Sequence, residues 1–247
     1  MNYVEYGKEN SDVIILLHGG GLSWWNYKEV AERLQTDYHV VLPILDGHAG
    51  CDKQFTTIEN NALDIIEFVN SKLGGSVLMM GGLSLGGQIL LEILSQRKDI
   101  CKYAIVESVL VIPSKFTYSM IKPAFGSCYG LIKYKWFSKL QFKSLRIKSN
   151  LFDEYYKDTC AITKSDMISF LQENSVYSLK DGIRDCEAIV WIFVGEKENN
   201  SIKKSAKLIH EKLQGSFIQI LPNMYHGEFS INYADRYVSK LLEIIKQ

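Results

Sequence analysis

The sequence predicts an α/β fold in which a mostly parallel central sheet carries helices on both faces. Apolar runs rich in β-branched residues recur along the chain, each followed by a turn and then by a helical pattern. This order is typical of a parallel sheet flanked by helices. The runs also lack polar alternation, as expected of strands that are buried on both faces. The 247 residues, 47% of them apolar, suffice for one large domain or for one domain with an inserted cap.

Six apolar runs are predicted to be strands of this sheet. They are short, as strands of a buried sheet usually are, and turn or helical patterns separate them. Residues 3–6 are a candidate for an additional edge strand. The six runs are residues 13–17, 40–45, 76–80, 103–106, 189–194 and 217–221.

Two helices between and after these strands have clear apolar faces. Thr56 and Glu59 have the spacing of a capping box, and Gly74 is expected to end the helix that follows. Similar spacing between residues 231 and 245 predicts a final helix that packs on the sheet. The apolar positions are Ile58, Ala62, Ile65, Ile66, Val69 and Leu73 in the first helix, and Ile231, Ala234, Val238, Leu241 and Ile245 in the second.

The alternation of strands and helices breaks between residues 113 and 183, where aromatic residues are dense. We interpret this stretch as a helical cap inserted into a core formed by residues 1–112 and 184–247. Because it falls between two predicted strands, both of its ends return to the same edge of the sheet. Such an insertion lies over the carboxyl ends of the strands, where open α/β sheets bind ligands.

Charge is unevenly distributed although the net charge is zero. The stretch from Ser108 to Phe152 has eight basic and no acidic side chains, which leaves 20 basic against 28 acidic residues elsewhere. Such asymmetry is compatible with attraction to an acidic substrate or an anionic surface, and a solvated helical face is the simpler interpretation. The role of the basic, aromatic stretch 115–148 stays open. Its basic residues are Lys115, Lys122, Lys133, Lys135, Lys139, Lys143, Arg146 and Lys148.

Composition restricts the class of protein further. The five cysteines are widely spaced and form no C-x-x-C pair, which argues against a zinc site or a dithiol redox motif. No stretch reaches the eighteen or so apolar residues that a membrane span needs, and the chain opens on a polar, mixed segment. We therefore expect a cytoplasmic protein without stable membrane insertion or a nucleic-acid partner, either monomeric or homodimeric.

The strongest local motif is G-x-S-x-G at residues 82–86, directly after a predicted strand and directly before a helical pattern. A strand-to-helix turn this tight holds Ser84 in a strained conformation with its hydroxyl exposed. It also aims the helix N-terminus and the Leu85 amide at the place where negative charge would develop. A phosphate-binding loop is excluded because Gln88 and Ile89 stand where it needs lysine and a hydroxyl residue. Ser84 is thus predicted to be a nucleophile rather than a mere helix cap.

A second motif, His-Gly-Gly-Gly at residues 18–21, follows the strand at 13–17. Acyl transfer needs two backbone amides that point at the oxyanion, and glycines let the chain approach the substrate closely. Gly20, or with less support Gly21, is expected to supply the amide that pairs with that of Leu85. A dinucleotide-binding turn is excluded because Trp24 occupies its third glycine position.

A general base and an acid can be assigned from the loops after the last two strands. His226 lies between the strand at 217–221 and the final helix, where it can come within about 3 Å of a serine hydroxyl. The imidazole then needs a carboxylate to orient it, and Glu198 lies in the loop after the strand at 189–194. The order Ser84, Glu198, His226 agrees with this assignment. Glu196 and Glu107 remain alternatives for the acid.

Other residues near these motifs have weaker assignments. His18 belongs to the oxyanion loop, and His48 is expected near the site without a catalytic task. Trp24 and Trp25 follow the oxyanion glycines, where they can line the substrate pocket together with Gly21 or lie in the core.

Together these motifs make the chain resemble the α/β-hydrolase superfamily, specifically its small, cap-bearing serine esterases and related hydrolases. The resemblance implies an eight-stranded type of sheet, a serine acyl-enzyme mechanism without metal or organic cofactor, and a substrate held between sheet and cap. Most members carry aspartate at the position of Glu198 and glycine at that of Ala49. The resemblance rests on residues 18–21, 46–48, 82–86, 195–198 and 226–227.

The expected activity is hydrolysis of an ester or related acyl bond in a small, largely apolar molecule, as in a carboxylesterase. An aminopeptidase, thioesterase, acyltransferase or C–C hydrolase would use the same triad. A ligand-binding receptor or sensor on this fold is another alternative, which the intact set of Ser84, His226 and a carboxylate disfavours. A membrane-surface lipase is a third, with an interfacial helix within residues 133–148.

Overall fold

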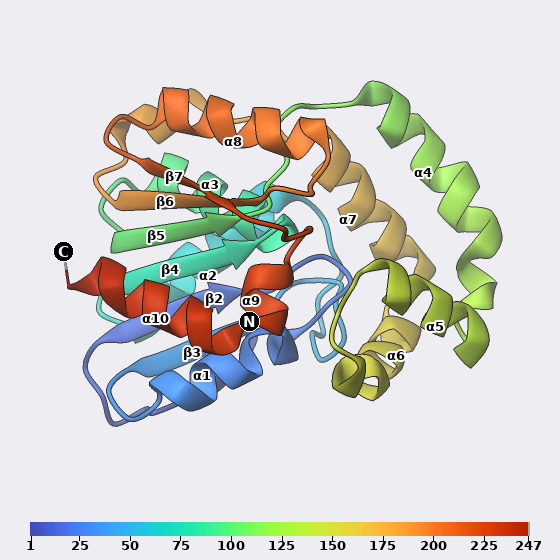
Figure 1. The fold of residues 1–247 in the computed structure, drawn as a ribbon, viewed down its shortest axis with the longest axis horizontal. Coiled ribbons are helices and arrows are strands. Elements are labelled where there is room, and N and C mark those ends of the chain that lie inside the picture. The colour runs from blue at the N-terminus through green and yellow to red at the C-terminus, as the bar shows by residue number, and fades with distance from the viewer. Residues whose placement is uncertain (247) are drawn as a thin grey trace.

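The computed structural model describes residues 1–246 and confirms the predicted fold class, a mostly parallel sheet with helices on both faces (Figure 1). The strand order is β1-β3-β2-β4-β5-β6-β7, and β1 alone runs antiparallel to its neighbour. All six predicted strands and the edge strand are present. They are β1 (Asn2–Tyr6), β2 (Val13–Leu17), β3 (His39–Ile44), β4 (Val77–Leu83), β5 (Cys101–Glu107), β6 (Ile189–Gly195) and β7 (Phe217–Leu221).

Two details of the sheet differ from the expectations. The described residues form seven strands rather than the eight that the resemblance implies, because only β1 precedes the parallel strands. In addition, β4 continues three residues past its predicted end at Met80. Gly82 and Leu83 looked like part of a turn, but they pair with Val106 and Glu107 of β5. The central strand therefore runs directly into Ser84.

Two apolar cores, one on each face, hold the helices against the sheet. Ile15 and Leu17 of β2 pack into the core under α2, α3 and α8, whereas Ile14 and Leu16 pack into the core under α1, α9 and α10. This alternation follows from the two-residue period of a strand. The flanking helices are α1 (Lys28–Leu34), α2 (Ile58–Lys72), α3 (Leu85–Gln96), α8 (Asn200–Lys212), α9 (Glu228–Asn232) and α10 (Ala234–Ile245).

The helix ends show two further differences from the predictions. The cap of α2 is Thr57, whose hydroxyl accepts a hydrogen bond from the Asn60 amide at 3.1 Å, so the helix begins one residue later than the Thr56 box predicts. Glu59 pairs instead with Lys180 at 2.8 Å. The predicted final helix is two helices, α9 and α10, which Tyr233 separates.

Four more helices lie between β5 and β6 in the chain. Figure 1 shows them at the end of the sheet toward which the parallel strands point. Residues 115–176 are called the helical segment below. None of the helices described for residues 1–246 combines the length and apolar character that crossing a bilayer requires. The four are α4 (Lys115–Cys128), α5 (Lys135–Ser144), α6 (Phe152–Ala161) and α7 (Lys164–Val176), and the short 3-10 helices are η1 (Trp24–Tyr27), η2 (Tyr129–Leu131), η3 (Ser149–Leu151) and η4 (Asp181–Asp185).

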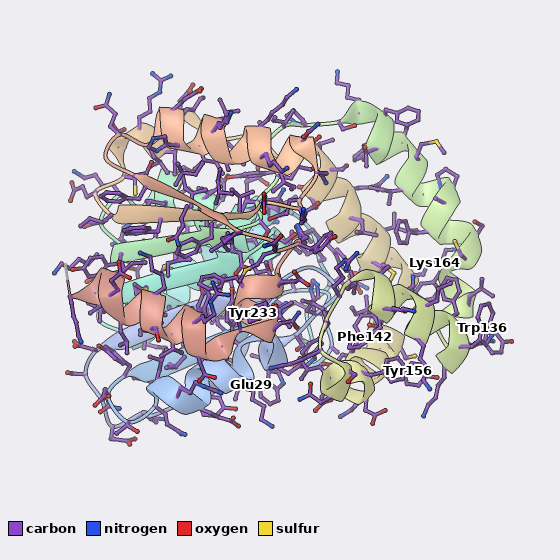
Figure 2. The ribbon with its side chains drawn as sticks, viewed as in Figure 1. Glu29, Trp136, Phe142, Tyr156, Lys164 and Tyr233 are labelled. Carbon is purple, nitrogen blue, oxygen red and sulfur yellow. The ribbon has the colours of Figure 1, made fainter. Side chains whose placement is uncertain are left out.

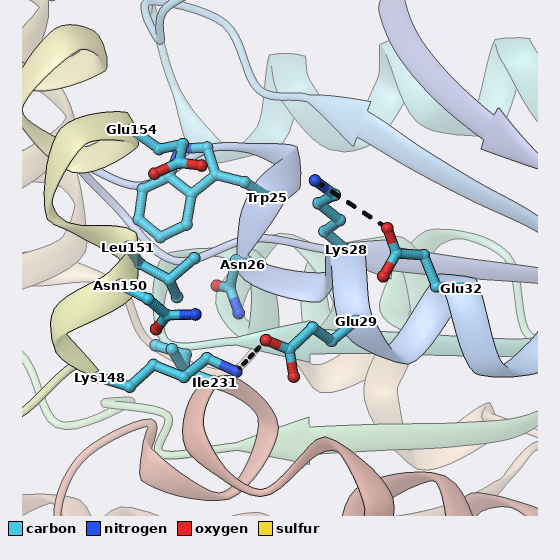
Figure 3. Close-up of a pocket in the computed structure, with 10 residues that line it drawn as sticks. All are labelled: Trp25, Asn26, Lys28, Glu29, Glu32, Lys148, Asn150, Leu151, Glu154 and Ile231. Atoms are coloured by element: carbon cyan, nitrogen blue, oxygen red, sulfur yellow. Dashed lines mark hydrogen bonds and ion pairs between the residues drawn. The ribbon is translucent and has the colours of Figure 1, made fainter.

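Polar contacts attach the helical segment to the sheet domain. The Trp25 indole donates to Asp158 at 2.9 Å, and Lys148 forms an ion pair with Glu29. Figure 3 shows that ion pair among the residues that line a small cavity of about 170 Å³ between the two parts. The helical segment is therefore docked on the core by specific side chains as well as by apolar packing.

Candidate active site

Ser84 occupies the single residue between β4 and α3 and has a strained backbone, with φ 52° and ψ −111°. Its amide donates to the Glu107 carbonyl at 2.9 Å, which anchors the turn to β5. The glycines of the motif are required sterically. A Cβ on Gly82 would lie 2.4 Å from the Gly86 carbonyl oxygen, and one on Gly86 would lie 2.3 Å from that of Leu17. The motif thus holds a non-glycine residue in a conformation that only close packing can maintain.

Two backbone amides near this turn remain free to bind an oxyanion. A Cβ on Gly20 would contact the Leu85 side chain at 3.4 Å, so the glycine loop and the start of α3 lie against each other. In residues 1–246 neither the Gly20 amide nor the Leu85 amide donates a hydrogen bond, whereas the amides of Gly19 and Gly21 donate to Asn26 and His48. Of the two glycines considered from the sequence, the structure therefore leaves Gly20 available.

His48 holds the glycine loop in place, a role that sequence reasoning missed. Its Nε2 accepts a hydrogen bond from the Gly21 amide at 3.0 Å, its Nδ1 lies 3.0 Å from the Asp46 carbonyl, and its ring stacks on Phe170. Burial lowers the pKa of His48 to about 4, which keeps the imidazole neutral and its Nε2 an acceptor. In the sequence, only the Asp46-Gly47-His48 loop indicated that His48 lies near the site. No rule of residue spacing predicts its hydrogen bond with the Gly21 amide.

His226 and Glu198, the predicted base and acid, are hydrogen-bonded to each other. His226 Nδ1 lies 2.9 Å from Glu198 Oε2, and the His226 side chain is 49% exposed whereas that of Glu198 is almost fully buried. Burial works to raise the pKa of Glu198, but hydrogen bonds from His226, the Gly195 amide and the Ser108 hydroxyl outweigh it and hold the pKa below its ordinary value. The carboxyl group is therefore charged at neutral pH and can stabilise an imidazolium.

The two alternative acids accept hydrogen bonds from other residues. Glu196 accepts a hydrogen bond from the Asn223 amide at 2.8 Å on the surface. Glu107 is buried and accepts one from the Ser230 amide at 3.3 Å, and burial raises the pKa of Glu107 to about 7. Neither carboxylate is hydrogen-bonded to His226. The structure thus pairs Glu198 with the imidazole, whereas Glu196 and Glu107 have other hydrogen-bond donors.

Ser108 links the parts of the site, and sequence reasoning missed it as well. It follows β5 with φ 58°, donates to Glu198 Oε1 at 2.7 Å and accepts a hydrogen bond from the Gly227 amide at 3.1 Å. The preceding residue, Glu107, accepts the hydrogen bond from the Ser84 amide. The end of β5 therefore connects the serine turn with the His226 loop. Within the described residues no hydrogen bond joins the Ser84 hydroxyl to His226, and such bonds often form only with substrate bound.

A cavity of about 260 Å³ opens at the glycine loop, where Gly20 and Gly21 line it. Trp25 does not reach it, because this nearly buried side chain lines the second cavity, shown in Figure 3. Trp24 packs instead against the core under α1 and α10. Neither tryptophan is therefore among the residues that line the cavity at the glycine loop. The cavity is lined by Gly20, Gly21, Leu22, Phe125, Ile132, Gln141, Ser144, Leu145, Tyr155, Thr159, Met167, Phe170 and Leu171.

Comparison with known proteins supports the fold and identifies the family. The sequence pattern of the alpha/beta hydrolase family matches residues 14–227. No curated protein matches the sequence. Among solved structures, an esterase from Exiguobacterium antarcticum superposes with a TM-score of 0.83 at 17% identity, covering 99% of this chain and 95% of that one. An enol-lactonase from Burkholderia xenovorans LB400 gives 0.82 at 14% identity, with 100% and 96% covered. A bromoperoxidase from Bacillus anthracis gives 0.83 at 15% identity, with 99% and 95% covered.

These identities are low enough that the structural likeness speaks for the fold alone. The family match, in contrast, spans most of the chain and includes the serine turn, the glycine loop and the loops that carry Glu198 and His226. The chain therefore belongs to the alpha/beta hydrolase family.

Proposed function

We propose that the protein is a serine hydrolase that cleaves an ester or related acyl bond in a small, largely apolar substrate. One combination of features carries this proposal. Ser84 has a strained backbone and lies near the Gly20 and Leu85 amides, neither of which donates a hydrogen bond within the described residues. In addition, the buried Glu198 carboxylate is hydrogen-bonded to His226 and orients it. Together these features serve acyl transfer, whereas ligand binding alone has no need of a carboxylate-paired histidine near a strained serine.

In the proposed mechanism Ser84 Oγ attacks the acyl carbonyl carbon while His226 Nε2 accepts the hydroxyl proton. The carbonyl oxygen becomes an oxyanion, which the Gly20 and Leu85 amides stabilise. His226 then protonates the leaving alcohol, and an acyl-enzyme on Ser84 remains. Water attacks this ester as His226 takes its proton, and the acid is released as Ser84 Oγ regains a proton. Glu198 stays ionised and holds His226 with Nε2 toward the serine.

The helical segment and its flanks, residues 113–183, serve in this proposal as the cap that encloses the acyl group. The cavity at Gly20 supports it, because ten of its thirteen lining residues come from this stretch and seven of those ten are apolar or aromatic. A volume of about 260 Å³ suits a small acyl chain rather than a long one. No acidic residue lines this cavity, which disfavours an aminopeptidase that must bind a substrate amine.

The proposal is tested with p-nitrophenyl esters of increasing acyl length. The expected result is burst release of p-nitrophenol with an optimum at short chains, absent from Ser84→Ala. A fluorophosphonate should label the wild-type protein and not the variant. Absence of turnover on every ester, together with absence of labelling, would contradict the proposal and favour the receptor alternative. Labelling without ester turnover would keep the nucleophile and point to a thioester or C–C substrate.

A further inference from the structure

Large apolar side chains are exposed mainly on the helical segment. Among the described residues, nine of the fourteen large apolar side chains that are exposed lie between residues 116 and 145. Three of them, Phe116, Trp136 and Leu140, are more than 60% exposed. Soluble monomers rarely gather so much apolar surface in one region without using it to bind something. The remaining six are Tyr118, Met120, Phe125, Leu131, Tyr134 and Leu145.

Helix α4 contributes four of these nine side chains because it has little protein to cover it. It packs against α7, and Ile121 is the only buried residue among its fourteen. Figure 1 shows α4 at the outer edge of the molecule, remote from the sheet. Figure 2 shows Trp136 of α5 pointing outward at the same end of the molecule. The two helices therefore present apolar side chains that no other described part of the chain covers.

The charge of this surface is one-sided. The eight basic residues between Ser108 and Phe152 face no acidic residue of that stretch, and within residues 1–246 only Lys148 among them forms an ion pair. The ammonium groups of Lys133, Lys135 and Lys139 lie instead over aromatic rings, at 5.4, 5.5 and 5.6 Å from the ring centroids. Cationic and aromatic groups are thus interleaved, and the cations are free to meet an external anion.

We propose that this face of α4 and α5, called the basic apolar face, docks on the surface of an anionic lipid bilayer. Aromatic and leucine side chains can enter the boundary between headgroups and acyl chains while lysines contact anionic headgroups. A lipid surface supplies negative charge everywhere, so it can satisfy cations at any spacing. A symmetric contact between two copies would instead bring the lysines of α4 and α5 against the same lysines of the second copy.

This inference does not depend on the reaction at Ser84. It concerns reversible binding at the surface and needs no spanning helix. The excess positive charge of the helical segment would hold the basic apolar face on the bilayer. The proposed acyl pocket would then lie close to the apolar molecules that the bilayer contains.

The test is co-sedimentation of the full-length protein with vesicles of phosphatidylcholine, either alone or mixed with phosphatidylserine. We expect binding at low salt to the mixed vesicles only, and loss of binding at high salt. The triple variant Lys133→Gln/Lys135→Gln/Lys139→Gln should lower partitioning by about 100-fold, or about fivefold for each charge. Trp136→Ala should lower it about tenfold by removing buried apolar area.

A matched control removes the same charge from another face. Lys203→Gln/Lys204→Gln/Lys207→Gln on α8 should leave partitioning within about twofold, since these lysines lie outside the helical segment. Hydrolysis of a soluble ester by every variant checks that the fold is intact and reports separately on the proposed reaction.

Three results would overturn the inference. The first is an absence of binding to mixed vesicles at low salt, and the second is an equal loss in both triple variants, which would mean attraction by net charge alone. The third is a finding, by sedimentation velocity without vesicles, that the wild-type protein is an oligomer and that the Trp136→Ala variant is not. That result would mean that the basic apolar face contacts another protein copy.

Discussion

Replacing His48 by glutamine should remove a large part of the acid sensitivity of this protein. Burial lowers the pKa of His48 to about 4, against 6.5 for the imidazole in an unfolded chain. The unfolded chain therefore binds more protons between these values, so the stabilisation is complete above pH 6.5 and decreases as the pH falls toward 4. Lowering the pH from 7.5 to 5 costs about 2 kcal/mol of unfolding free energy through His48 alone.

The glutamine side chain does not titrate, but it can still accept the hydrogen bond from the Gly21 amide through its carbonyl oxygen. We therefore expect His48→Gln to be less stable than wild type at pH 7.5 through lost packing on Phe170, yet to lose about 2 kcal/mol less on acidification. Burial also lowers the pKa of His18 to about 3, and the neighbouring His48 adds to that lowering, so His48→Gln should reduce the contribution of His18 slightly as well.

Urea unfolding at pH 7.5 and pH 5 measures this difference. The matched control is His210→Gln, which removes an exposed histidine on α8, keeps His48 in place, and should therefore still lose about 2 kcal/mol through His48 on acidification. If His48→Gln lost as much stability on acidification as wild type, the imidazole would not be held neutral by burial. The account of how it positions the glycine loop would then fail.

Three further predictions concern the rest of the site. Glu198→Gln should lower kcat by about 10³ to 10⁴ in ester hydrolysis, whereas Glu107→Gln should change it by less than about threefold; the reverse order would reassign the acid. Ser108→Ala should lower the unfolding free energy by about 1–3 kcal/mol and kcat/KM about tenfold, measured by urea titration and initial rates. Gly86→Ala should prevent soluble expression or lower the free energy of unfolding by about 3 kcal/mol or more, because the added Cβ would lie 2.3 Å from a backbone oxygen. The control Gly130→Ala places its Cβ in open space and should leave thermal stability unchanged.

The fold was predictable because parallel strands that are buried on both faces appear in the sequence as continuous apolar runs. All six predicted strands are present, and the largest discrepancy at a strand end, in β4, came from Gly81 and Gly82. Two adjacent glycines predict a turn when only the local sequence is considered, but backbone pairing with β5 holds Gly81 and Gly82 in an extended conformation. The one-residue error at the start of α2 has a similar origin, because Thr56 and Thr57 are both good caps and only the backbone geometry selects Thr57.

The site was predictable only where chemistry requires a motif. The serine turn and the glycine loop are contiguous and sterically constrained, so a short sequence pattern marks them. The contacts of Ser108 and His48 join residues that are 90 and 27 positions apart, and no local pattern encodes them. Trp25 is a different case, because its sequence position beside the glycines suggested the pocket while its indole bonds to Asp158 of the helical segment.

The cavity at the glycine loop and the residues Ser84, Glu198 and His226 come from different parts of the chain, and this separation has an evolutionary consequence. Ten of the thirteen residues that line the cavity at the glycine loop come from residues 115–176, one uninterrupted stretch of sequence. Ser84, Glu198 and His226 all lie outside that stretch. It is attached to the sheet domain through identifiable contacts, among them Trp25 with Asp158 and Lys148 with Glu29. If the proposed function holds, a lineage or an engineer could therefore replace the stretch and retain those attachments, and so change the specificity of the proposed hydrolase without altering Ser84, Glu198 or His226.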